Sequence, residues 1–393
     1  MYTAAPFKYD FPSLSSGYDN QGRITEVRNT ELLVTGHVDL DHEWRGGQWQ
    51  AYLLATGLAA RGHPTHVFTQ PDTPLARRLR GSAVQVHELK YRGEWDVFAA
   101  RRLAAMVRDA GVQLVATHAS HSHGLCAVAR HLGLEAPLVV HRRVDFAVAK
   151  NFLSRRKYAT PEGFVAVSEA VKQYLIDGGV KPERIWVVLD GVPDHVPVPD
   201  AKTKLARETG LDADAPWVGD VASFVDHKGH VHLLNAWAKV MEQGVRAELV
   251  LVGDGELRPR LEAQIARLNL AHAHLVGWQD DVSAWLSSFD IFAMTSVTDG
   301  LCSAILDAMA ARIPVVATAA GGIPEIVSHD KTGLLAPVGD ANAIAAYIIE
   351  ALRDRQKMSA LADRAYEEVW RTHSADVMVE KTLAVYREIV SRS

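Results

Sequence analysis

The sequence predicts an α/β protein of two domains, each built around a parallel β-sheet. Short apolar runs alternate with stretches of helical periodicity, which is the pattern of repeated βαβ units. The alternation stops at a proline-rich segment, Asp190–Ala201, and then begins again. The length of 393 residues also favours two domains, since one domain usually holds about 100–200 residues.

In the first half of the chain, apolar runs of strand length are separated by helical patterns. The expected strands are Glu31–Thr35, Thr65–Thr69, Ala83–Glu88, Leu114–Thr117, Leu138–His141, Gly163–Val167 and Ile185–Leu189. The expected helices are Gly47–Arg61, Val97–Asp109, Gly124–His131 and Glu169–Gly178. Residues 1–30 are polar with scattered aromatic residues, so we expect an N-terminal extension followed by a first domain over 31–195.

The second half repeats the pattern after the prolines, which lack a backbone donor and interrupt regular elements. The expected strands are Trp217–Ala222, Ala247–Val252, Ala273–Leu275, Ile291–Met294, Val315–Ala317 and Gly333–Ala336. The expected helices are His230–Gln243, Glu256–Leu268, Val282–Ser287, Ser303–Ala311, Ile323–Val327, Ala341–Arg353 and Gln356–Thr372. We therefore expect a second domain over 196–373 and a last helix over 374–393 that packs back on the first domain.

The composition favours a cytoplasmic globular protein. With 48% hydrophobic residues and a net charge of −5, the chain lacks the basic excess of a nucleic-acid-binding protein. The two cysteines, Cys126 and Cys302, lie far apart, which fits a reducing compartment. No apolar run approaches the roughly 20 residues of a membrane span, and no signal pattern opens the chain.

The segment 295–326 carries the strongest chemical signal. A strand is expected to end near Met294, and Gly300 then allows close approach of the backbone before a helix begins. The amides at the start of that helix are well placed to bind a phosphate, because they lack partners and the helix dipole favours an anion. Asp299 and Asp307 bracket this position and suit a sugar and a ribose diol. The alternative is that Asp299 caps the loop and Asp307 is solvated.

The residues from 299 to 327, DGLCSAILDAMAARIPVVATAAGGIPEIV, resemble the signature of family 4 of the GT-B glycosyltransferases. The signature is Glu-x7-Glu within "EG…EAMA.G.PVVA…GG.PE", and aspartates replace both glutamates here. The resemblance continues in LVGDGELRPRLE, FVDHKGHVHLLNAW, HDKTGLLAPVGD and LATGLAARGHPTHVFT. It covers roughly residues 32–387 and implies the GT-B fold, two Rossmann-like domains whose parallel sheets face each other across a cleft.

The resemblance also implies roles for individual residues. Asp299, His118 and Lys228 would act at the transferred sugar and the diphosphate, and Asp307 would bind the ribose. The remaining donor-binding positions are Gly46, Gly47, Ser223, Gly300, Leu301 and Cys302. Ser223 departs from the family, which commonly has an arginine there, and Arg142, Arg143 or another basic residue would have to replace that cation.

Histidines and arginines follow two strands of the first half. His118, His121 and His123 have a spacing that could suggest metal ligands, but the family uses no metal and we expect none. Arg142 and Arg143 could contact an acidic or phosphorylated acceptor, or instead form ion pairs with Asp145 or other residues. Together with Arg155, Arg156 and Lys157 they could also offer a basic surface to a membrane, although a solvated charge run is the plainer explanation.

The resemblance therefore predicts a retaining, metal-independent glycosyltransferase without a cofactor. Its donor would be a nucleotide diphosphate-sugar, UDP- or GDP-linked, and its acceptor a carbohydrate or a lipid-linked sugar in bacterial surface polysaccharide or lipopolysaccharide synthesis. It would act in the cytoplasm, with contact to the inner face of the membrane as one option. Two alternatives remain, a nucleotide-sugar epimerase on the same fold and a non-catalytic nucleotide-sugar binder.

Overall fold

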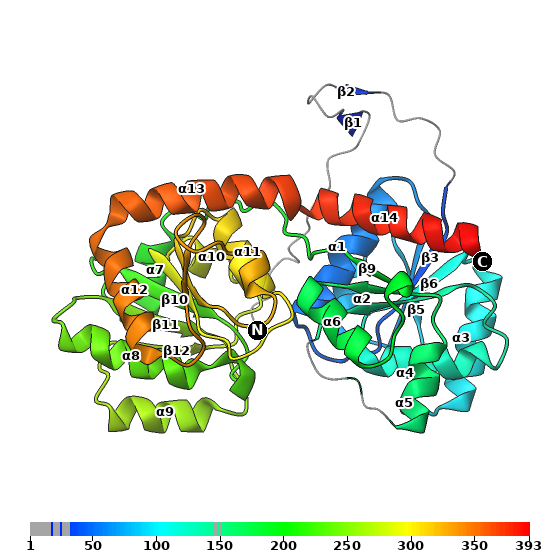
Figure 1. Cartoon of the computed structure of the whole chain (residues 1–393), viewed down its shortest axis with the longest axis horizontal. Coiled ribbons are helices and arrows are strands. Elements are labelled where there is room, and N and C mark those ends of the chain that lie inside the picture. Colours follow the sequence, from blue (N-terminus) through cyan, green and yellow to red (C-terminus); the bar gives the residue numbers. More distant parts are fainter. Residues whose placement is uncertain (1–16, 19–23, 26–31, 145–147, 149–150) are drawn as a thin grey trace. The chain divides into compact units, whose positions relative to one another are not determined.

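The computed structural model describes residues 17–18, 24–25, 32–144, 148 and 151–393. Two compact units divide the chain, one of Met1–Gly191 with Ala375–Ser393 and one of Val192–Ser374. Each unit is built on its own parallel sheet with helices around it, which confirms the prediction of an α/β protein with two parallel sheets (Figure 1). The division after Gly191 falls inside the proline-rich segment 190–201.

The sheet of the first unit has the strand order β5-β4-β3-β6-β7-β8-β9, and every neighbouring pair is parallel. Its strands are β3 (Thr35–Val38), β4 (Thr65–Thr69), β5 (Gln85–Glu88), β6 (Leu114–Thr117), β7 (Leu138–Arg142), β8 (Gly163–Ala166) and β9 (Ile185–Val187). The expected extension over 1–30 lies outside the described residues except for one antiparallel pair, β1 (Gly17–Tyr18) with β2 (Ile24–Thr25).

Seven α-helices among the described residues surround this sheet. They are α1 (Gly46–Ala60), α2 (Pro74–Leu79), α3 (Val97–Asp109), α4 (Ser120–Arg130), α5 (Phe152–Ala159), α6 (Glu169–Asp177) and, from the end of the chain, α14 (Ala375–Arg392). The last helix lies along α1 (Figure 1). Met378, Val379 and Tyr386 of α14 share a buried apolar cluster with Tyr52 and Leu53 of α1, so the C-terminal helix belongs to the core of the first unit.

The sheet of the second unit has the order β12-β11-β10-β13-β14-β15, again parallel throughout. Its strands are β10 (Trp217–Val221), β11 (Glu248–Val252), β12 (Ala273–Gly277), β13 (Ile291–Met294), β14 (Val315–Thr318) and β15 (Leu334–Ala336). Its helices are α7 (Ala201–Thr209), α8 (His230–Glu242), α9 (Arg258–Arg267), α10 (Ser283–Leu286), α11 (Ser303–Ala310), α12 (Ala341–Arg353) and α13 (Arg355–Thr372).

Two kinds of element differ from the expectation. The first strand was expected over Glu31–Thr35 and instead runs over Thr35–Val38, because the polar residue His37 is fully buried inside the sheet and hides the strand from a hydropathy pattern. Three short helices, α2, α5 and α7, were not expected. The eight residues of α5 include none that is buried, so the helix has no apolar stripe to reveal it.

Candidate functional site

The order of the second sheet brings two distant segments together at one point. Strands β10 and β13 are neighbours although two strands intervene in the sequence, and helices pack on both sides of such a switch point. Ligands of open parallel sheets bind beyond the carboxyl ends of the strands there. The segment after β10 carries Lys228, and the segment after β13 carries Asp299.

Lys228 and Asp299 form an ion pair at this switch point. The Lys228 Nζ lies 2.5 Å from the Asp299 Oδ2, and the two side chains are 19% and 12% exposed. The Ser296 hydroxyl donates a second hydrogen bond to the same carboxylate oxygen at 3.3 Å. The pair is therefore mostly, but not wholly, shielded from water.

Backbone contacts fix the two loops that carry this pair. Gly229 has a φ of +69°, and a Cβ there would overlap the carbonyl oxygen of Thr295. The Thr295 hydroxyl donates to the Gly229 carbonyl at 3.1 Å, and the Val297 amide donates to the His227 carbonyl at 2.8 Å. Only glycine fits such a close backbone approach, so the sequence Lys-Gly places the lysine against the opposite loop.

A second glycine turn supports Asp299 from its other side. Gly321 has a φ of +52°, and a Cβ there would overlap the Asp299 carbonyl oxygen. The Gly322 amide donates to that carbonyl at 3.0 Å. The Gly-Gly turn that follows β14 therefore helps to hold the backbone of the Asp299 loop.

The charge of Lys228 is stabilised by its neighbours. Burial by itself lowers the pKa of this ammonium, but the negative charges that Cys302 and Asp299 can carry outweigh burial and raise the pKa above its ordinary value. Burial raises the pKa of the Cys302 thiol, so that thiol is neutral at physiological pH and Asp299 is the working counter-ion. Lys228 is a permanent cation here, which is the property that a diphosphate-binding residue needs.

Helix α11 starts directly after this pair. Cys302 precedes it with a φ of +73°, a strained conformation for a residue with a side chain. Within the described part of the chain, the amide groups of Leu301, Cys302 and Ser303 donate to no acceptor. These amides provide a set of unpaired donors at a helix N-terminus beside a lysine, an arrangement that binds phosphate.

Asp307 lies in the second turn of α11 and is half-buried. Burial raises the pKa of its carboxyl to about 7. No hydrogen bond to this carboxylate is formed by any residue that the structure describes. A ligand that donates hydrogen bonds, such as a ribose diol, would satisfy it.

Ser223 follows β10 and is half-buried, and its carbonyl accepts a hydrogen bond from the Val225 amide. The structure gives no cation at this position. Two arginines contact residues that follow Ser223 in the chain: Arg258 lies over the Phe224 ring at 5.8 Å, and Arg260 pairs with Asp226 at 3.5 Å. Either arginine belongs to the same unit as Lys228.

The switch point of the first sheet carries a chain of hydrogen bonds. Strands β3 and β6 are neighbours there, and His37 Nδ1 lies 3.0 Å from His118 Nε2. The Arg143 guanidinium approaches His118 Nδ1 at 3.1 Å and donates to Asp190 at 2.9 Å. The His37 Nε2 lies 3.3 Å from the Thr35 hydroxyl.

The protons of this chain can be assigned. Arginine only donates, so His118 Nδ1 must accept, and a neutral His118 then carries its proton on Nε2 and donates it to His37. Burial lowers the pKa of His37 to about 3 and that of His118 well below its usual value, which keeps both rings neutral. Both nitrogens of His118 are therefore occupied, and it could contact a sugar only if one of these bonds opened.

Further aromatic residues complete this cluster. The His118 ring stacks on His141, with ring centres 4.7 Å apart, and the His141 Nε2 lies 2.6 Å from the Tyr386 hydroxyl of α14. No sequence pattern indicated that His37, His141, Asp190 and Tyr386 form one cluster, since they come from separate elements. His37 lies within β3 and His141 within β7, the two strands that border β6, and these positions were the available signal.

The two arginines expected to contact an acceptor lie inside the first unit. Arg142 is 8% exposed and donates to the Tyr158 hydroxyl at 3.1 Å. Arg143 pairs with Asp190, and Asp145, its suggested partner, is outside the described residues. Both guanidinium groups, at the carboxyl end of β7, are thus bound to other residues of the first unit.

The expected glycines open helix α1 after the loop that follows β3. A Cβ at Gly47 would meet no atom within 4 Å, so packing does not require glycine there. Nearby Asp39 is fully buried, and burial raises the pKa of its carboxyl to about 7. This carboxylate accepts a hydrogen bond from Gln48 at 3.2 Å, which makes it part of the structure of the glycine loop rather than a solvated loop charge.

The three histidines with metal-like spacing have separate partners. His121 pairs with Glu94 at 3.0 Å, and His123 bonds to the Lys157 carbonyl at 3.0 Å, while His118 bonds to His37. No group of three potential metal ligands occurs among residues 32–144, 148 and 151–393. In the same part of the chain, no helix has the length and apolar character needed to cross a membrane.

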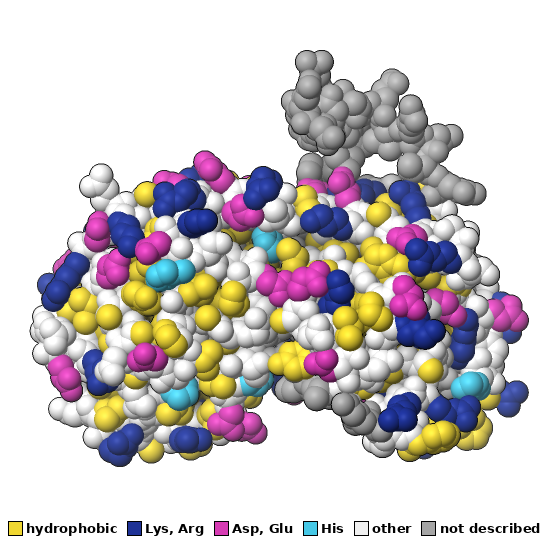
Figure 2. Space-filling view, in the orientation of Figure 1, with side chains coloured by type: hydrophobic (Ala, Val, Ile, Leu, Met, Phe, Trp, Pro, Cys, Tyr) yellow, Lys and Arg dark blue, Asp and Glu magenta, His cyan; other side chains and the backbone are white. Residues whose placement is uncertain are grey.

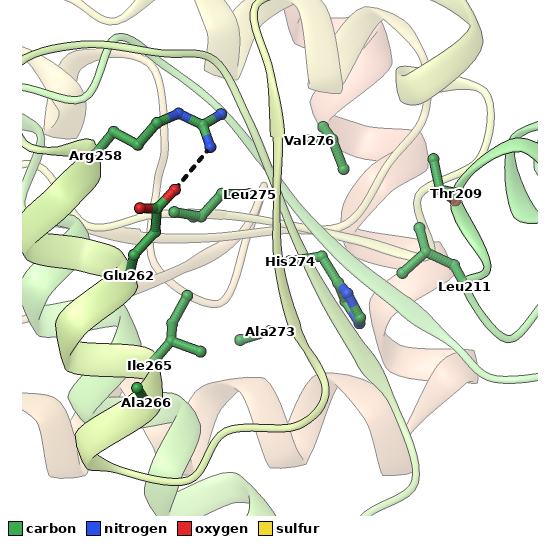
Figure 3. Close-up of a pocket in the computed structure, with 10 residues that line it drawn as sticks. All are labelled: Thr209, Leu211, Arg258, Glu262, Ile265, Ala266, Ala273, His274, Leu275 and Val276. Atoms are coloured by element: carbon green, nitrogen blue, oxygen red, sulfur yellow. Dashed lines mark hydrogen bonds and ion pairs between the residues drawn. The ribbon is translucent and has the colours of Figure 1, made fainter.

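An open pocket of about 540 Å³ lies elsewhere in the second unit (Figure 3). Its walls come from α9, from the edge strand β12 and from the end of α7, and most of the lining side chains are apolar. Its charged groups Arg258 and Glu262 neutralise each other at 3.1 Å. None of the expected site residues lines it, so it is distinct from the Lys228–Asp299 site.

Two family sequence models match the chain over most of its length. Residues 44–195 match Glycosyltransferase Family 4, and residues 201–368 match Glycosyl transferases group 1. The second match includes Lys228, Asp299 and Asp307, the residues that surround the phosphate-binding geometry described above.

Relatives and solved structures agree with these matches. N-acetyl-alpha-D-glucosaminyl L-malate synthase of Bacillus anthracis is 25% identical over 86% of this chain and 92% of its own length. The lipopolysaccharide core biosynthesis glycosyltransferase LpsE of Rhizobium meliloti is 33% identical over 44% of this chain and 49% of its own length.

The structure of Anabaena Alr3699/HepE in complex with UDP and glucose has the same fold, with a TM-score of 0.80 at 20% identity over 91% of this chain and 100% of that chain. WaaG, a glycosyltransferase involved in lipopolysaccharide biosynthesis, follows with a TM-score of 0.68 at 16% identity over 90% and 99%. With its two parallel sheets and both family matches, the chain belongs to family 4 of the GT-B glycosyltransferases.

Proposed function

We propose that this glycosyltransferase moves a sugar from a nucleotide diphosphate-sugar to an acceptor hydroxyl, with retention of the anomeric configuration and without a metal ion. The observation that carries the proposal is the Lys228–Asp299 pair beside the unpaired amides at the start of α11. A fixed cation and several amide donors stabilise the charge that a diphosphate gains as it departs. This is the role that a divalent metal plays in other sites.

The reaction breaks the bond between the anomeric carbon and the diphosphate oxygen, and forms a bond between that carbon and the acceptor oxygen on the same face. The nucleoside diphosphate leaves with the electron pair of the broken bond. The acceptor loses its hydroxyl proton, which the departing phosphate oxygen takes up. Because that oxygen serves as the base, the reaction needs no protein base.

We propose a uridine diphosphate donor and a carbohydrate or lipid-linked acceptor. The Anabaena protein has been solved with UDP-glucose, and relatives of this chain are named for lipopolysaccharide core and amylovoran biosynthesis. Asp307 would accept hydrogen bonds from the ribose diol, and Lys228 would contact the diphosphate. The reaction would take place in the cytoplasm, where nucleotide-sugars are made, and no cofactor besides the donor is required.

The test is a transfer assay with purified protein, UDP- and GDP-linked hexoses, a panel of sugar acceptors and excess EDTA. We expect release of the nucleoside diphosphate and an anomeric proton in the product with the same configuration as in the donor. Lys228→Gln should abolish the release, and Lys239→Gln, a change on the same unit but outside the site, should not. Absence of both transfer and donor hydrolysis with every donor would disprove the proposal.

Two observations favour a second candidate, a nucleotide-sugar binder without turnover. Ser223 provides no cation, and both motif carboxylates are the shorter aspartate, so the site has less charge and less reach than the family pattern. This candidate predicts donor binding by calorimetry with no product in the transfer assay. The same assay without acceptor tests an epimerase, which would convert the donor sugar to its isomer.

A further inference from the structure

Two surface helices of the first unit begin with the same sequence pattern. FAARR at residues 98–102 lies at the start of α3, and FLSRR at residues 152–156 opens α5. Residues three and four apart lie on the same side of a helix, so each phenylalanine shares a side with two arginines. We infer that these two patterns form a binding surface for an anionic lipid membrane, which we call the FxxRR surface.

The apolar side chains of the FxxRR surface are unusually exposed. Phe98 is 82% exposed and Phe152 is 70% exposed, while their neighbours Trp95 and Leu153 are 68% and 58% exposed. Figure 2 shows hydrophobic side chains next to basic ones at the lower right, around the position of α5. Large apolar side chains gathered in water mark a site of interaction, since their burial is favourable.

The arginines of this surface are available to a partner. Arg101, Arg102, Arg155 and Arg156 are all exposed, and none forms an ion pair with a described residue. Arg156 only lies over the Phe152 ring at 5.8 Å. By contrast, Lys157 is neutralised by Glu94 at 3.0 Å, so the four arginines carry the charge of the surface.

Contacts within the first unit hold the two helices in place. Glu94, directly before Trp95, binds Lys157 of α5 and His121 of α4. Lys157 also donates to the Ser120 carbonyl of α4 at 2.8 Å. The loop before α3 and the last turn of α5 are thus tied to the same end of α4, so the two patterns have a fixed relation to each other.

A membrane suits this surface better than a protein or a nucleic acid. The Phe98 and Phe152 rings are 82% and 70% exposed, so they suit a partner that deforms around them, as the boundary of headgroups and acyl chains does. Arginines beside the rings would then meet lipid phosphates at whatever spacing the lipids adopt. A soluble polyanion would engage the arginines and leave the rings in water. The inference goes beyond the proposed function and does not depend on the donor site.

The test is co-sedimentation of the full chain with vesicles of phosphatidylcholine alone or with one third phosphatidylglycerol. We expect binding to the anionic vesicles only. Each replacement of an arginine by glutamine should lower the partition coefficient about fivefold. The positions to replace are Arg101, Arg102, Arg155 and Arg156. The control replaces four exposed arginines of the second unit by glutamine, which gives the same net charge. These control positions are Arg207, Arg267, Arg353 and Arg355.

The rings are tested by Phe98→Ser with Phe152→Ser, which should also weaken vesicle binding. Three results would overturn the inference: no binding of the wild type to anionic vesicles, an equal loss in the control variant, or full vesicle binding by the double serine variant. Hydrolysis of free donor in solution should be the same in every variant, so the outcome is independent of the proposed catalytic function.

Discussion

The ion pair between Lys228 and Asp299 explains why a shortened motif can still hold a working geometry. The aspartate reaches the lysine at 2.5 Å because Gly229 and Gly321 let the backbones of neighbouring loops approach its own loop. The close approach of these backbones places the shorter aspartate side chain within reach of the lysine. The carboxylate fixes the lysine and raises its pKa, and the lysine remains positively charged for a diphosphate.

Replacing Asp299 by asparagine should impair both catalysis and stability. The amide has the same size but no charge, so kcat/KM should fall about 100-fold, the usual effect of losing one fixed electrostatic contact. The unfolding free energy should fall by about 1–3 kcal/mol, because Lys228 loses its partner in a mostly buried position. Transfer kinetics and urea denaturation measure the two effects.

The control for this change is Asp226→Asn in the loop before Lys228. Asp226 is 78% exposed and pairs only loosely with Arg260. The activity should change by less than about twofold, and the unfolding free energy by less than about 0.5 kcal/mol. If Asp299→Asn behaved like the control, the ion pair would have no role in the site.

Asp307 should make donor binding depend on pH. Burial raises its pKa to about 7, so part of the free protein carries a neutral carboxyl at neutral pH, whereas hydroxyl groups of a ribose bond best to the ionised form. The affinity for UDP-glucose should therefore fall about tenfold for each pH unit below 7 and level off above 8. Calorimetry between pH 5.5 and 8.5, roughly 1.5 units on each side of that pKa, measures this dependence.

Asp307→Asn provides the matching control. It should bind more weakly at pH 8 and lose the pH dependence, since the titrating group is gone. Its stability at pH 8 should be no lower than that of the wild type, because an ionised carboxylate in a position that favours the neutral form destabilises the folded state above the unfolded pKa. An affinity that stays flat from pH 5.5 to 8.5 in the wild type, the same span of about 1.5 units around the pKa, would contradict the role given to Asp307.

At the scale of elements, the C-terminal helix α14 contributes a side chain to the histidine cluster of the first unit. Its Tyr386 is fully buried and bonds to His141, which stacks on His118. The helix thus stabilises the histidine cluster through this hydrogen bond. Its Ile389 and Met378 side chains also pack in the apolar core of the first unit.

A graded pair of substitutions separates these two roles. Tyr386→Phe removes only the hydroxyl and leaves His141 without a partner, which should cost about 1–3 kcal/mol. Tyr386→Ala also leaves a cavity in the core and should cost about 3–5 kcal/mol. Urea unfolding gives both values. Equal effects of the two changes would show that the hydroxyl, and not the packing, carries the contribution of this residue.

The elements could be predicted in proportion to how apolar they are. Strands such as Leu114–Thr117 and Ile291–Met294 are continuous buried and largely apolar runs, and the structure confirms their bounds. The first strand was misplaced because His37 lies inside it, and α5 was missed because its residues are all at least partly exposed. Polar residues are buried only where tertiary contacts satisfy them, and the sequence pattern of one segment does not contain those contacts.

At the scale of the whole molecule, acid should destabilise the two units unequally. His37, His118, His123 and His141 are all buried in the first unit with lowered pKa values, about 3 for His37 and His123. An unfolded chain takes up protons on these groups below pH 6.5, whereas the folded unit does not. Each histidine therefore costs up to about 1.4 kcal/mol of stability per pH unit below that value.

We expect the urea transition of the first unit to move to lower concentrations between pH 7.5 and 5.5, a range that spans the ordinary histidine pKa of about 6.5. The transition of the second unit should move less. The His141→Gln variant should take up about one proton fewer when the first unit unfolds, so the stability of that unit should depend less on pH. The substitution should also lower the stability of the unit at every pH, because it disturbs the packing. Tryptophan fluorescence and circular dichroism can follow the two transitions. A parallel shift of both units would show that the buried histidines do not govern acid stability.

The sequence by itself determined the α/β class, the two parallel sheets and the family, because these rest on hydrophobic periodicity and on local motifs that survive in one dimension. It also marked Lys228, Asp299 and Asp307 as candidates. Only the tertiary structure brought Lys228 to Asp299 and assigned both nitrogens of His118, since the strand order of each sheet joins segments far apart in the chain. Contact between distant side chains is decided by packing, which no local pattern encodes.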